Sequence, residues 1–383
     1  MRSISDTLSR LAASKVMGAS AAAGTGDDRL SDLGAFGSNC GALKARVYIP
    51  SDLPRGAPLV VVLHGCTQTA AGYDRGSGWS RLADRHGFAV LFPEQQRANN
   101  ANLCFNWFVP GDIRRGGGEA LSIRQMVARM VEAHGIDPKR IFITGLSAGG
   151  AMTSVMLATY PEVFAGGAII AGLPYGVAAS LPQALDAMRG HGQASDSRLA
   201  GLVRKASKHV GPWPTLSVWH GDADHTVAAS NADAVLGQWR TLHGVAETPT
   251  RTDRIAGHRH RVWCDAGGRV LIEDYRIAGM GHGTPLNASA PGSDEIAGPH
   301  MLDVGLSSTL QVAASWGLVS SAAVETVGVK QSVSPDLLPG RPSSQRGSGR
   351  PAPRHAAARP SGSPTGGVGK IIEDALRAAG LMR

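Results

Sequence analysis

The chain has few aromatic residues and no long uninterrupted apolar stretch. Phe, Trp and Tyr make up 5% of its 383 residues, so the core must rest mainly on Val, Ile, Leu and Ala, for which the 43% of hydrophobic residues provide enough material. A transmembrane helix needs roughly 18 consecutive apolar residues. No segment approaches that length, so we expect no membrane span. Near the N-terminus, Asp6, Arg10 and Lys15 interrupt any apolar core, so this segment does not predict a secretory signal peptide.

Motifs that hold metal ions or phosphate groups are also missing. The sequence contains no CxxC pair, no Cys and His cluster at metal-ligand spacing, and no glycine-rich phosphate loop at the end of a strand. We therefore expect neither a metal nor an organic cofactor.

The excess of positive charge lies mostly at the C-terminal end. The formal net charge is +8, and from Lys330 onward nine Lys or Arg residues stand against three acids, a local net charge of +6. The rest of the chain is nearly balanced, which argues against nucleic acid as a substrate. The basic C-terminal end could still contact an anionic surface.

The most informative motif is GLSAG at residues 145–149. It follows an apolar run at residues 140–144, which predicts a buried strand, and precedes a helical pattern at residues 151–160. Such a setting predicts a sharp strand-to-helix turn that lifts the hydroxyl of Ser147 above the sheet, with glycines where side chains would collide with neighbouring backbone. The motif therefore indicates a nucleophilic serine; the alternative is a turn that only needs small residues.

A serine nucleophile needs a base and an orienting acid, and in hydrolases with this turn the chain order is Ser, acid, His. The strand predicted at residues 214–220 runs into a loop with two acids. We predict Asp224 as the acid, because it lies further into the loop and is followed by Val227 as a hydrophobic anchor. Asp222 is expected to be a turn former that bonds its own backbone.

The predicted base is His282. Residues 270–277 alternate like a strand and run into AGMGHG, where His282 lies between two glycines after the last predicted strand. The alternative is an ordinary histidine on a surface loop. Four other candidate bases precede that strand and would break the chain order: His220, His225, His258 and His260.

An oxyanion hole is expected near the early apolar run at residues 59–63, which predicts a central parallel strand buried on both faces. In this class of hydrolase one N–H comes from the residue after the nucleophile, here Ala148, and a second comes from the loop after this strand. We predict that Cys66 donates the second through its backbone. The alternative, Cys66 as a nucleophile, lacks the strand–turn–helix setting of Ser147.

Four cysteines permit three full disulfide pairings, and the sequence does not select one: Cys40, Cys66, Cys104 and Cys264. A bridge between Cys66 and Cys104 is a hypothesis that would pin the oxyanion loop to the aromatic segment CFNWF at residues 104–108.

A predicted amphipathic helix begins at Glu119 and runs to about Ala133, and a glutamate in its first turn suits the helix dipole.

Taken together, these motifs resemble the esterase family of poly(3-hydroxybutyrate) depolymerases, specifically the catalytic domain of short-chain polyhydroxyalkanoate depolymerases. The resemblance covers roughly residues 41–318 and rests on the segments LHGCTQTAAGYDRGSGWSRLADRHGFAVLFPEQQ, NLCFNWF, RRGGGEALSIRQMV, GLSAGGAM, HGDADHTV and AGMGHGTPL. It implies an α/β-hydrolase fold, with a mostly parallel sheet and helices on both faces, and carboxylic-ester hydrolysis by Ser147, Asp224 and His282. It also supports the oxyanion role of the loop at Cys66 and suggests an extracellular enzyme.

The substrate follows less directly than the reaction. We expect cleavage of short-chain hydroxyalkanoate polyester or its oligomers through an acyl-enzyme, with Trp107 and Phe105 as the wall against which the substrate lies. These aromatics are equally interpretable as ordinary core residues. Related families act on feruloyl or acetyl esters of polysaccharides, which is the alternative activity. A third alternative is a polyester-granule-associated binding protein.

Four segments are expected along the chain. They are an N-terminal extension at residues 1–40, the catalytic domain at residues 41–318, a disordered Pro/Gly/Ser/Arg-rich linker at residues 319–368 and a short amphipathic helix at residues 369–383. Within the catalytic domain, residues 173–214 are expected to form a helical excursion that covers the site as a small cap.

Overall fold

The structure is a computed structural model that describes residues 28–320. The chain divides into two units, Met1–Leu30 and Ser31–Arg383, and the description below concerns the second as far as residue 320. Most of the predicted N-terminal extension, the linker beyond residue 320 and the terminal helix at residues 369–383 lie outside the described residues.

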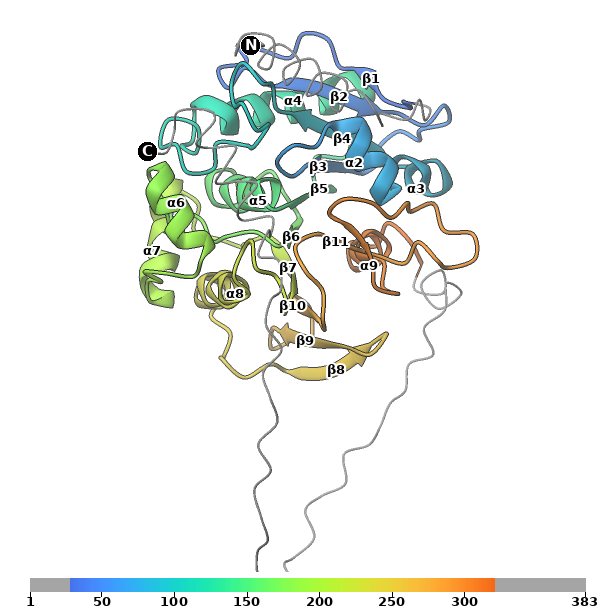
Figure 1. Cartoon of the computed structure of the whole chain (residues 1–383). Helices are drawn as coiled ribbons and strands as arrows, with labels where there is room; N and C mark the ends of the chain where they lie inside the picture. The colour runs from blue at the N-terminus through green and yellow to red at the C-terminus, as the bar shows by residue number, and fades with distance from the viewer. Residues whose placement is uncertain (1–27, 321–383) are drawn as a thin grey trace, which may run out of the picture. The chain divides into compact units, whose positions relative to one another are not determined.

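A mixed sheet of ten strands runs through the described part of the second unit, in the order β1-β2-β4-β3-β5-β6-β7-β10-β9-β8 (Figure 1). Its central strands pair in parallel: β4 (Ala89–Glu94), β3 (Leu59–Leu63), β5 (Ile141–Leu146), β6 (Gly166–Ile170), β7 (Thr215–Gly221) and β10 (Val270–Ile277). Its outer strands pair antiparallel: β2 (Lys44–Tyr48) and β1 (Ser31–Asp32) at one edge, β9 (His258–Cys264) and β8 (Arg251–Ile255) at the other.

Helices cover both faces of this sheet. Figure 1 shows α5 and α8 on one side and α3 and α9 on the other. The helices of the described region are α2 (Ala70–Ser77), α3 (Trp79–His86), α4 (Gly118–His134), α5 (Ala148–Thr159), α6 (Leu181–Met188), α7 (Asp196–Ala206), α8 (Ser230–His243) and α9 (Ser308–Ser315). This is the α/β-hydrolase architecture expected from the sequence. Between residues 28 and 320, no helix combines the length and the apolar content needed to cross a membrane.

The uninterrupted apolar run at residues 59–63 forms β3, and the prediction of a central strand is confirmed. All five of its residues are buried, and it pairs in parallel with β4 on one side and β5 on the other. The carboxyl ends of parallel strands meet at one edge of a sheet. The loops after β3, β5, β7 and β10 therefore gather at the same edge.

The structure contains a pair of strands that the sequence did not predict. The strands β11 (Thr284–Leu286) and β12 (Met301–Asp303) form a separate parallel pair after β10, so β10 is the last strand of the large sheet but not of the chain. Runs of three residues are too short for an alternation pattern to be recognised. The helical excursion at residues 173–214 contains α6 and α7, as expected.

His260 in β9 is buried and lies between two acidic side chains near one edge of the sheet. Its Nδ1 lies 2.7 Å from Oδ1 of Asp253, and its Nε2 lies 3.1 Å from Oε1 of Glu273. The ring stacks on Tyr275, which in turn stacks on Trp219. Burial alone would lower the pKa of His260, but the hydrogen bonds and charges of Glu273 and Asp253 outweigh it and raise the pKa.

A histidine whose pKa is raised on folding stabilises the fold fully below its unfolded pKa and loses that contribution as the pH rises through its folded pKa. We predict that the unfolding free energy of the wild type exceeds that of His260→Gln most at about pH 6, and that this difference shrinks as the pH rises to about 9. Urea unfolding at a series of pH values measures this difference in unfolding free energy. His225→Gln, a substitution at an exposed histidine, is the control. A difference that stays constant over this range would contradict this stabilisation by the two acidic side chains.

Candidate active site

Ser147 lies on the sharp turn between β5 and α5. Its backbone has φ 57°, a left-handed conformation that non-glycine residues rarely adopt, and its N–H donates to the carbonyl of Ile170 at 2.9 Å. A Cβ at Gly145 would lie 2.5 Å from the backbone of Gly149, and a Cβ at Gly149 would lie 2.6 Å from the carbonyl oxygen of His64. The two flanking positions therefore accept only glycine, and the predicted strand-to-helix turn is confirmed.

Hydrogen bonds join Ser147, His282 and Asp224 in one line. Nε2 of His282 lies 2.8 Å from Oγ of Ser147, and Nδ1 lies 2.7 Å from Oδ2 of Asp224. The three side chains come from the loops after β5, β10 and β7, which gather at one edge of the sheet. Because a carboxylate oxygen accepts, Nδ1 of the imidazole carries the proton, and Nε2 is free to accept from the serine hydroxyl.

Asp224 is held by several donors. Its Oδ1 accepts from the backbone N–H groups of Thr226 and Val227 at 2.8 and 2.9 Å, and Nε2 of His220 lies 3.4 Å from Oδ2. Burial of Asp224 alone would raise its pKa, but the hydrogen bonds from His220, His282 and the Val227 N–H outweigh burial and hold the pKa below its ordinary value. The carboxylate therefore stays ionised beside His282.

Asp222, the competing acid, points elsewhere. Its Oδ1 accepts from the backbone N–H of Gly279 at 2.7 Å. The expectation that it bonds its own backbone is therefore corrected, because its partner lies in the loop after β10. Asp222 ties the loop of Asp224 to the loop of His282.

The competing histidines do not contact the serine hydroxyl. His220 is buried, and its Nε2 lies 2.9 Å from the carbonyl of Val227. His258 lies in β9 with its Nε2 3.1 Å from the carbonyl of Val304, and His225 is exposed. Of the five histidines considered, only His282 contacts the serine hydroxyl.

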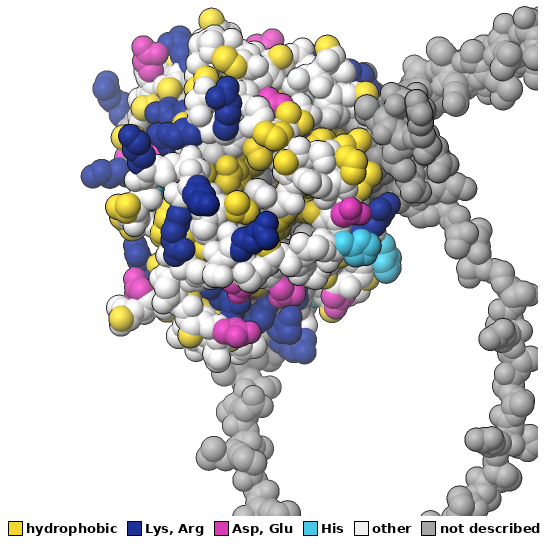
Figure 2. All heavy atoms as spheres, turned by 90° about the vertical axis from the view of Figure 1, so that its left-hand side faces the viewer, with side chains coloured by type: hydrophobic (Ala, Val, Ile, Leu, Met, Phe, Trp, Pro, Cys, Tyr) yellow, Lys and Arg dark blue, Asp and Glu magenta, His cyan; other side chains and the backbone are white. Residues whose placement is uncertain are grey.

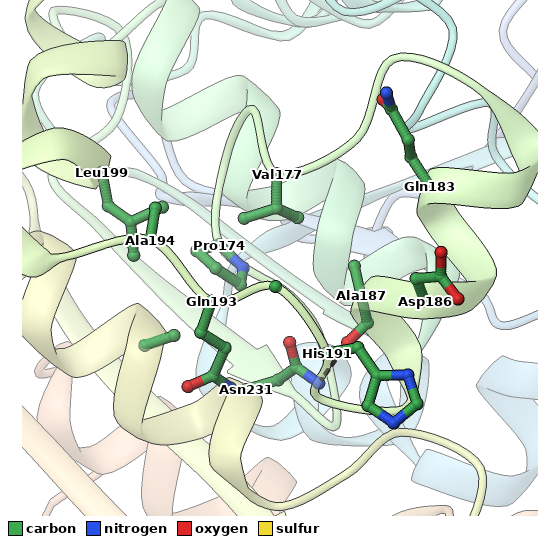
Figure 3. A pocket seen from close by; sticks show the side chains of 12 residues that line it. Pro174, Val177, Gln183, Asp186, Ala187, His191, Gln193, Ala194, Leu199 and Asn231 are labelled. Atoms are coloured by element: carbon green, nitrogen blue, oxygen red, sulfur yellow. Dashed lines mark hydrogen bonds between the residues drawn. The ribbon is translucent and has the colours of Figure 1, made fainter.

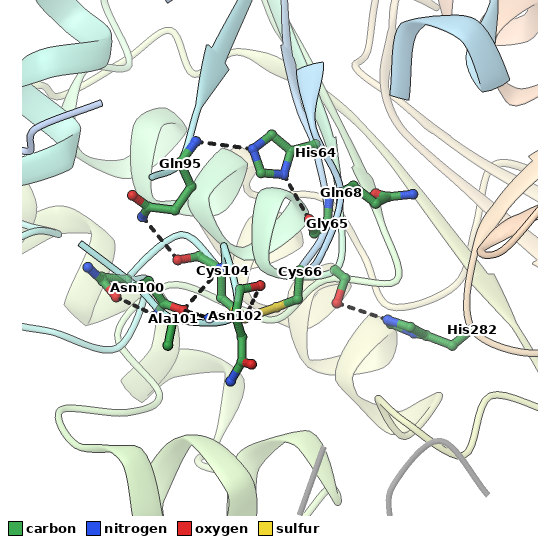
Figure 4. The surroundings of a disulfide bond; sticks show 12 residues. His64, Gly65, Cys66, Gln68, Gln95, Asn100, Ala101, Asn102, Cys104 and His282 are labelled. Carbon is green, nitrogen blue, oxygen red and sulfur yellow. Dashed lines mark hydrogen bonds between the residues drawn. A yellow bond between two sulfur atoms is a disulfide. The ribbon is translucent and has the colours of Figure 1, made fainter. Parts of the chain in front are cut away.

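The loop after β3 is tied to the segment that follows β4. Cys66 forms a disulfide with Cys104, and the backbone N–H of Thr67 donates to the carbonyl of Asn102 at 2.7 Å (Figure 4). The hypothesis of a Cys66–Cys104 bridge is confirmed. The other two cysteines are free, Cys40 exposed and Cys264 half-buried.

Two backbone N–H groups near Ser147 remain available for an oxyanion. Ala148 is the first residue of α5, and the first N–H groups of a helix have no partner within it. Among the described residues, the N–H of Cys66 donates to no acceptor. The structure brings both residues to the cavity that contains Ser147.

That cavity has a volume of about 480 Å³, and Ser147 and His282 both line it. The helix α6 contributes a largely apolar wall from Leu181, Ala184, Leu185 and Met188. Figure 2 shows hydrophobic side chains gathered around a hollow on the face that α6 and α7 occupy. The helical excursion thus borders the site, as a small cap would.

The two aromatic candidates have different places. Trp107 lines the cavity, together with Phe108. Phe105 does not: it is 0% exposed, and its ring packs against His64 with 5.0 Å between centroids. The expectation that Phe105 contacts substrate is corrected, because its ring is buried against His64 and does not line the cavity.

Glu119 has a more specific role than the helix dipole suggested. Its Oε1 accepts from Nε2 of Gln95 at 2.6 Å and from Nδ2 of Asn99 at 3.2 Å, while Oε2 accepts from the N–H of Asn106 at 2.8 Å. Burial raises the pKa of Glu119 to about 8, because these neutral donors do not offset its loss of hydration. The side chain fastens the segment at residues 95–106, which lines the cavity.

Sequence reasoning missed His300. Its ring lies 5.8 Å from that of His282 between centroids, its Nδ1 lies 3.1 Å from the carbonyl of His282, and it lines the cavity. The segment before it has no periodicity, so no signal marked it.

A second cavity of about 200 Å³ lies beyond α6, between that helix and residues 191–194 (Figure 3). Among its polar lining side chains, Gln183, Asp186, His191 and Gln193 are exposed, whereas Asn231 is buried.

The sequence and the fold of this chain are similar to those of known proteins. The family model described as "Esterase PHB depolymerase" matches residues 43–263. Poly(3-hydroxyalkanoate) depolymerase C of Paucimonas lemoignei is 47% identical over 293 residues, which cover 76% of this chain and 70% of that protein. An acetylxylan esterase of Coprinopsis cinerea is 32% identical over 266 residues, covering 67% of this chain and 70% of the relative.

A feruloyl esterase B of Talaromyces funiculosus is 29% identical over 269 residues, covering 68% of this chain and 74% of that protein. Among solved structures, the acetyl xylan esterase from Aspergillus awamori superposes with a TM-score of 0.61 at 26% identity, covering 66% of this chain and 93% of that chain. Ser147 and Asp224 lie inside the residues matched by the family model, whereas His282 lies beyond them.

The disulfide is expected to stabilise the fold. We predict that reduction of the Cys66–Cys104 bridge lowers the unfolding free energy by about 2–4 kcal/mol, because the cross-link restricts the unfolded chain. Denaturant unfolding with and without reductant measures this, and peptide mapping of the non-reduced protein identifies the linked pair. Cys40→Ser serves as the control and should leave the unfolding free energy unchanged. Free thiols at both Cys66 and Cys104 before reduction would contradict the bridge.

Proposed function

Because the chain belongs to the esterase PHB depolymerase family and is a carboxylic ester hydrolase, we propose that Ser147 is its nucleophile, His282 its general base and Asp224 the residue that orients the base. The observation that carries this proposal is the unbroken hydrogen-bonded line from Asp224 through His282 to Ser147. The line ends in a cavity large enough for a substrate.

The proposed reaction is acyl transfer in two steps. Nε2 of His282 takes the hydroxyl proton of Ser147 as Oγ attacks the ester carbonyl, and Asp224 stabilises the imidazolium that forms. The imidazolium then gives this proton to the leaving alkoxide, and the alcohol departs. In the second step His282 takes a proton from water, whose oxygen attacks the acyl-serine ester. His282 then returns this proton to Oγ of Ser147 as the acid leaves.

The oxyanion of each tetrahedral intermediate would lie against the backbone N–H groups of Ala148 and Cys66. Ala148 also stands at the N-terminus of α5, where the helix dipole favours negative charge. Loss of one such donor typically costs about a hundredfold to a thousandfold in turnover. Since the contribution of Cys66 comes from its backbone, its thiol is not needed for the chemistry.

We propose a short-chain hydroxyalkanoate polyester or its oligomers as the substrate. The relative at 47% identity, a poly(3-hydroxyalkanoate) depolymerase, supports this choice. The apolar side chains of α6 and Trp107 suit methyl and methylene groups, while Asn102 and Gln68 bring amide groups to the cavity for ester oxygens. The feruloyl and acetylxylan esterase relatives make polysaccharide esters the second candidate.

The two acids of the loop after β7 give a matched test of the mechanism. Ser147→Ala should lower kcat by about a millionfold, and Asp224→Asn should lower it by roughly ten-thousandfold because the imidazole loses its orienting carboxylate. Asp222→Asn should change kcat by less than about tenfold, since the amide oxygen of Asn can still accept from Gly279 N–H and Oδ1 of Asp222 bonds that N–H rather than His282. Steady-state hydrolysis of p-nitrophenyl butyrate measures all three. Equal losses for the two Asp variants would contradict the assignment of Asp224.

The substrate choice is tested by parallel assays on hydroxybutyrate trimer, a suspension of amorphous polymer, methyl ferulate and acetylated xylan. We predict that kcat/KM for the trimer exceeds that for methyl ferulate by about tenfold or more, because the feruloyl ring lacks the ester groups that Asn102 and Gln68 could bind. Preference for either polysaccharide-type ester would favour the second candidate.

Co-sedimentation with the same polymer suspension tests whether the basic C-terminal end contacts polyester. Co-sedimentation of the full chain is compared with that of a chain that ends at residue 330. Binding without hydrolysis by the full chain would favour the granule-associated binding protein considered from the sequence.

A further inference from the structure

His64 lies at the end of β3, directly before the loop that contains Cys66. The side chain is 1% exposed and does not line the cavity. Each ring nitrogen nevertheless has a backbone partner: Nδ1 lies 2.8 Å from the carbonyl oxygen of Gly65, and Nε2 lies 3.1 Å from the backbone nitrogen of Gln95 (Figure 4). No step of the mechanism above uses this histidine.

These two partners fix the tautomer of the ring. A backbone N–H can only donate, so Nε2 must carry no proton where it faces Gln95. A carbonyl oxygen can only accept, so Nδ1 carries the proton and donates it to Gly65. Burial lowers the pKa of His64, which keeps the ring neutral as this pattern requires.

The carbonyl that His64 holds belongs to the same peptide unit as the N–H of Cys66. A trans peptide unit is planar, and its C=O and N–H point in opposite directions. Fixing the oxygen of Gly65 therefore fixes the direction in which the N–H of Cys66 points. A hydrogen bond to the oxygen also polarises the amide and strengthens its N–H as a donor.

We propose that His64 is a positioning residue that aims the N–H of Cys66 at the oxyanion by holding the Gly65 carbonyl through Nδ1. This inference rests on the proposed function, since it assigns a role within the same oxyanion hole. His64 contacts neither substrate nor reacting atoms and acts only through the peptide unit between Gly65 and Cys66.

The partner of Nε2 is itself held rigidly by buried side chains. Nε2 of Gln95 donates to the carbonyl of Cys104 at 3.0 Å and to Oε1 of Glu119 at 2.6 Å. Gln95 is 2% exposed and Glu119 is 0% exposed. The network behind the ring therefore keeps Gln95 N–H in place, and with it the ring orientation that directs Nδ1 to Gly65.

Two substitutions at position 64 separate the two ring nitrogens. In His64→Asn the side-chain amide nitrogen takes the place of Nδ1 and retains the donor to Gly65, but nothing reaches Gln95. In His64→Gln the terminal amide lies near the place of Nε2 and retains an acceptor for Gln95. The short side-chain bond to the Gly65 carbonyl is lost, and that carbonyl keeps only the longer bond from the N–H of Gln68 at 3.3 Å. Both variants remove one hydrogen bond and are similar in polarity.

The proposal predicts that His64→Gln lowers kcat for p-nitrophenyl butyrate by about tenfold to a hundredfold, with KM changed by less than about twofold, because the oxyanion contact forms only in the transition state. His64→Asn should retain kcat within about fivefold. Inhibition by a trifluoromethyl ketone, whose adduct with Ser147 carries an oxyanion, should weaken in step with kcat across the two variants. Thermal unfolding of both variants confirms that each is folded at the assay temperature.

A purely structural role would give the two variants similar losses or would leave kcat of folded His64→Gln unchanged, and either result overturns the proposal. If neither variant folds, nitrogen-15 NMR of the imidazoles in the wild type decides instead. A proton on Nδ1 of His64 supports the proposal, and a proton on Nε2 overturns it. A wild type without esterase activity, or an active Ser147→Ala, would instead overturn the proposed function itself.

Discussion

The close approach of the first turn of α5 to the end of β3 is the constraint on which the site depends. No side chain fits at Gly149, because its Cβ would overlap the carbonyl groups of Leu63 and His64. This contact places the backbone of Ala148 beside the loop that contains Cys66, although more than 80 residues (roughly the length of a small domain) separate them in sequence. It also forces Ser147 into its left-handed backbone conformation. Backbone packing thus brings the nucleophile and the two N–H donors close together, and the Cys66–Cys104 disulfide ties down the loop of the second donor.

Two buried carboxyl groups near the cavity show how hydrogen-bond donors determine whether a carboxyl group is ionised. Asp224 accepts from imidazoles and backbone N–H groups, which outweigh its burial and hold its pKa low. Glu119 accepts only from neutral amides, so burial dominates and raises its pKa to about 8. Asp224 is consequently suited to stabilise an imidazolium, whereas Glu119 is suited to join neutral segments of the chain. The difference arises from the neighbours, because both side chains are removed from water.

Most of the fold and the line of Ser147, Asp224 and His282 could be predicted from the sequence, because each depends on a local pattern with a strong physical cause. The apolar run of β3 and the glycines around Ser147 are examples, since burial and steric overlap leave few alternatives there. Phe105 was misplaced because its direction depends on which face of an irregular segment meets the core.

The network of His64, Gln95 and Glu119 was missed for a different reason. Its members lie up to 55 positions apart in sequence, and each looks unremarkable in its own segment. Only the pairing of β3 with β4 and the packing of α4 on β4 bring them together. Hydrogen bonds between buried polar groups of distant segments leave no periodic signal, so a sequence pattern cannot indicate them.

The loops of the acid and the base are tied directly to each other, whereas the nucleophile is held by other elements. Beyond the pairing of β7 with β10, Asp222 accepts from Gly279 N–H, and Ala223 N–H donates to the carbonyl of Met280 at 3.1 Å. These bonds fix the loop of His282 to the loop of Asp224 before either side chain is considered. Ser147 and the oxyanion donors are fixed separately by β3 and α5. The strand β6 pairs with both β5 and β7, so one continuous sheet joins the two groups of loops. The hydrogen bond between Ser147 and His282 then links the nucleophile to an acid–base pair whose loops are already tied together.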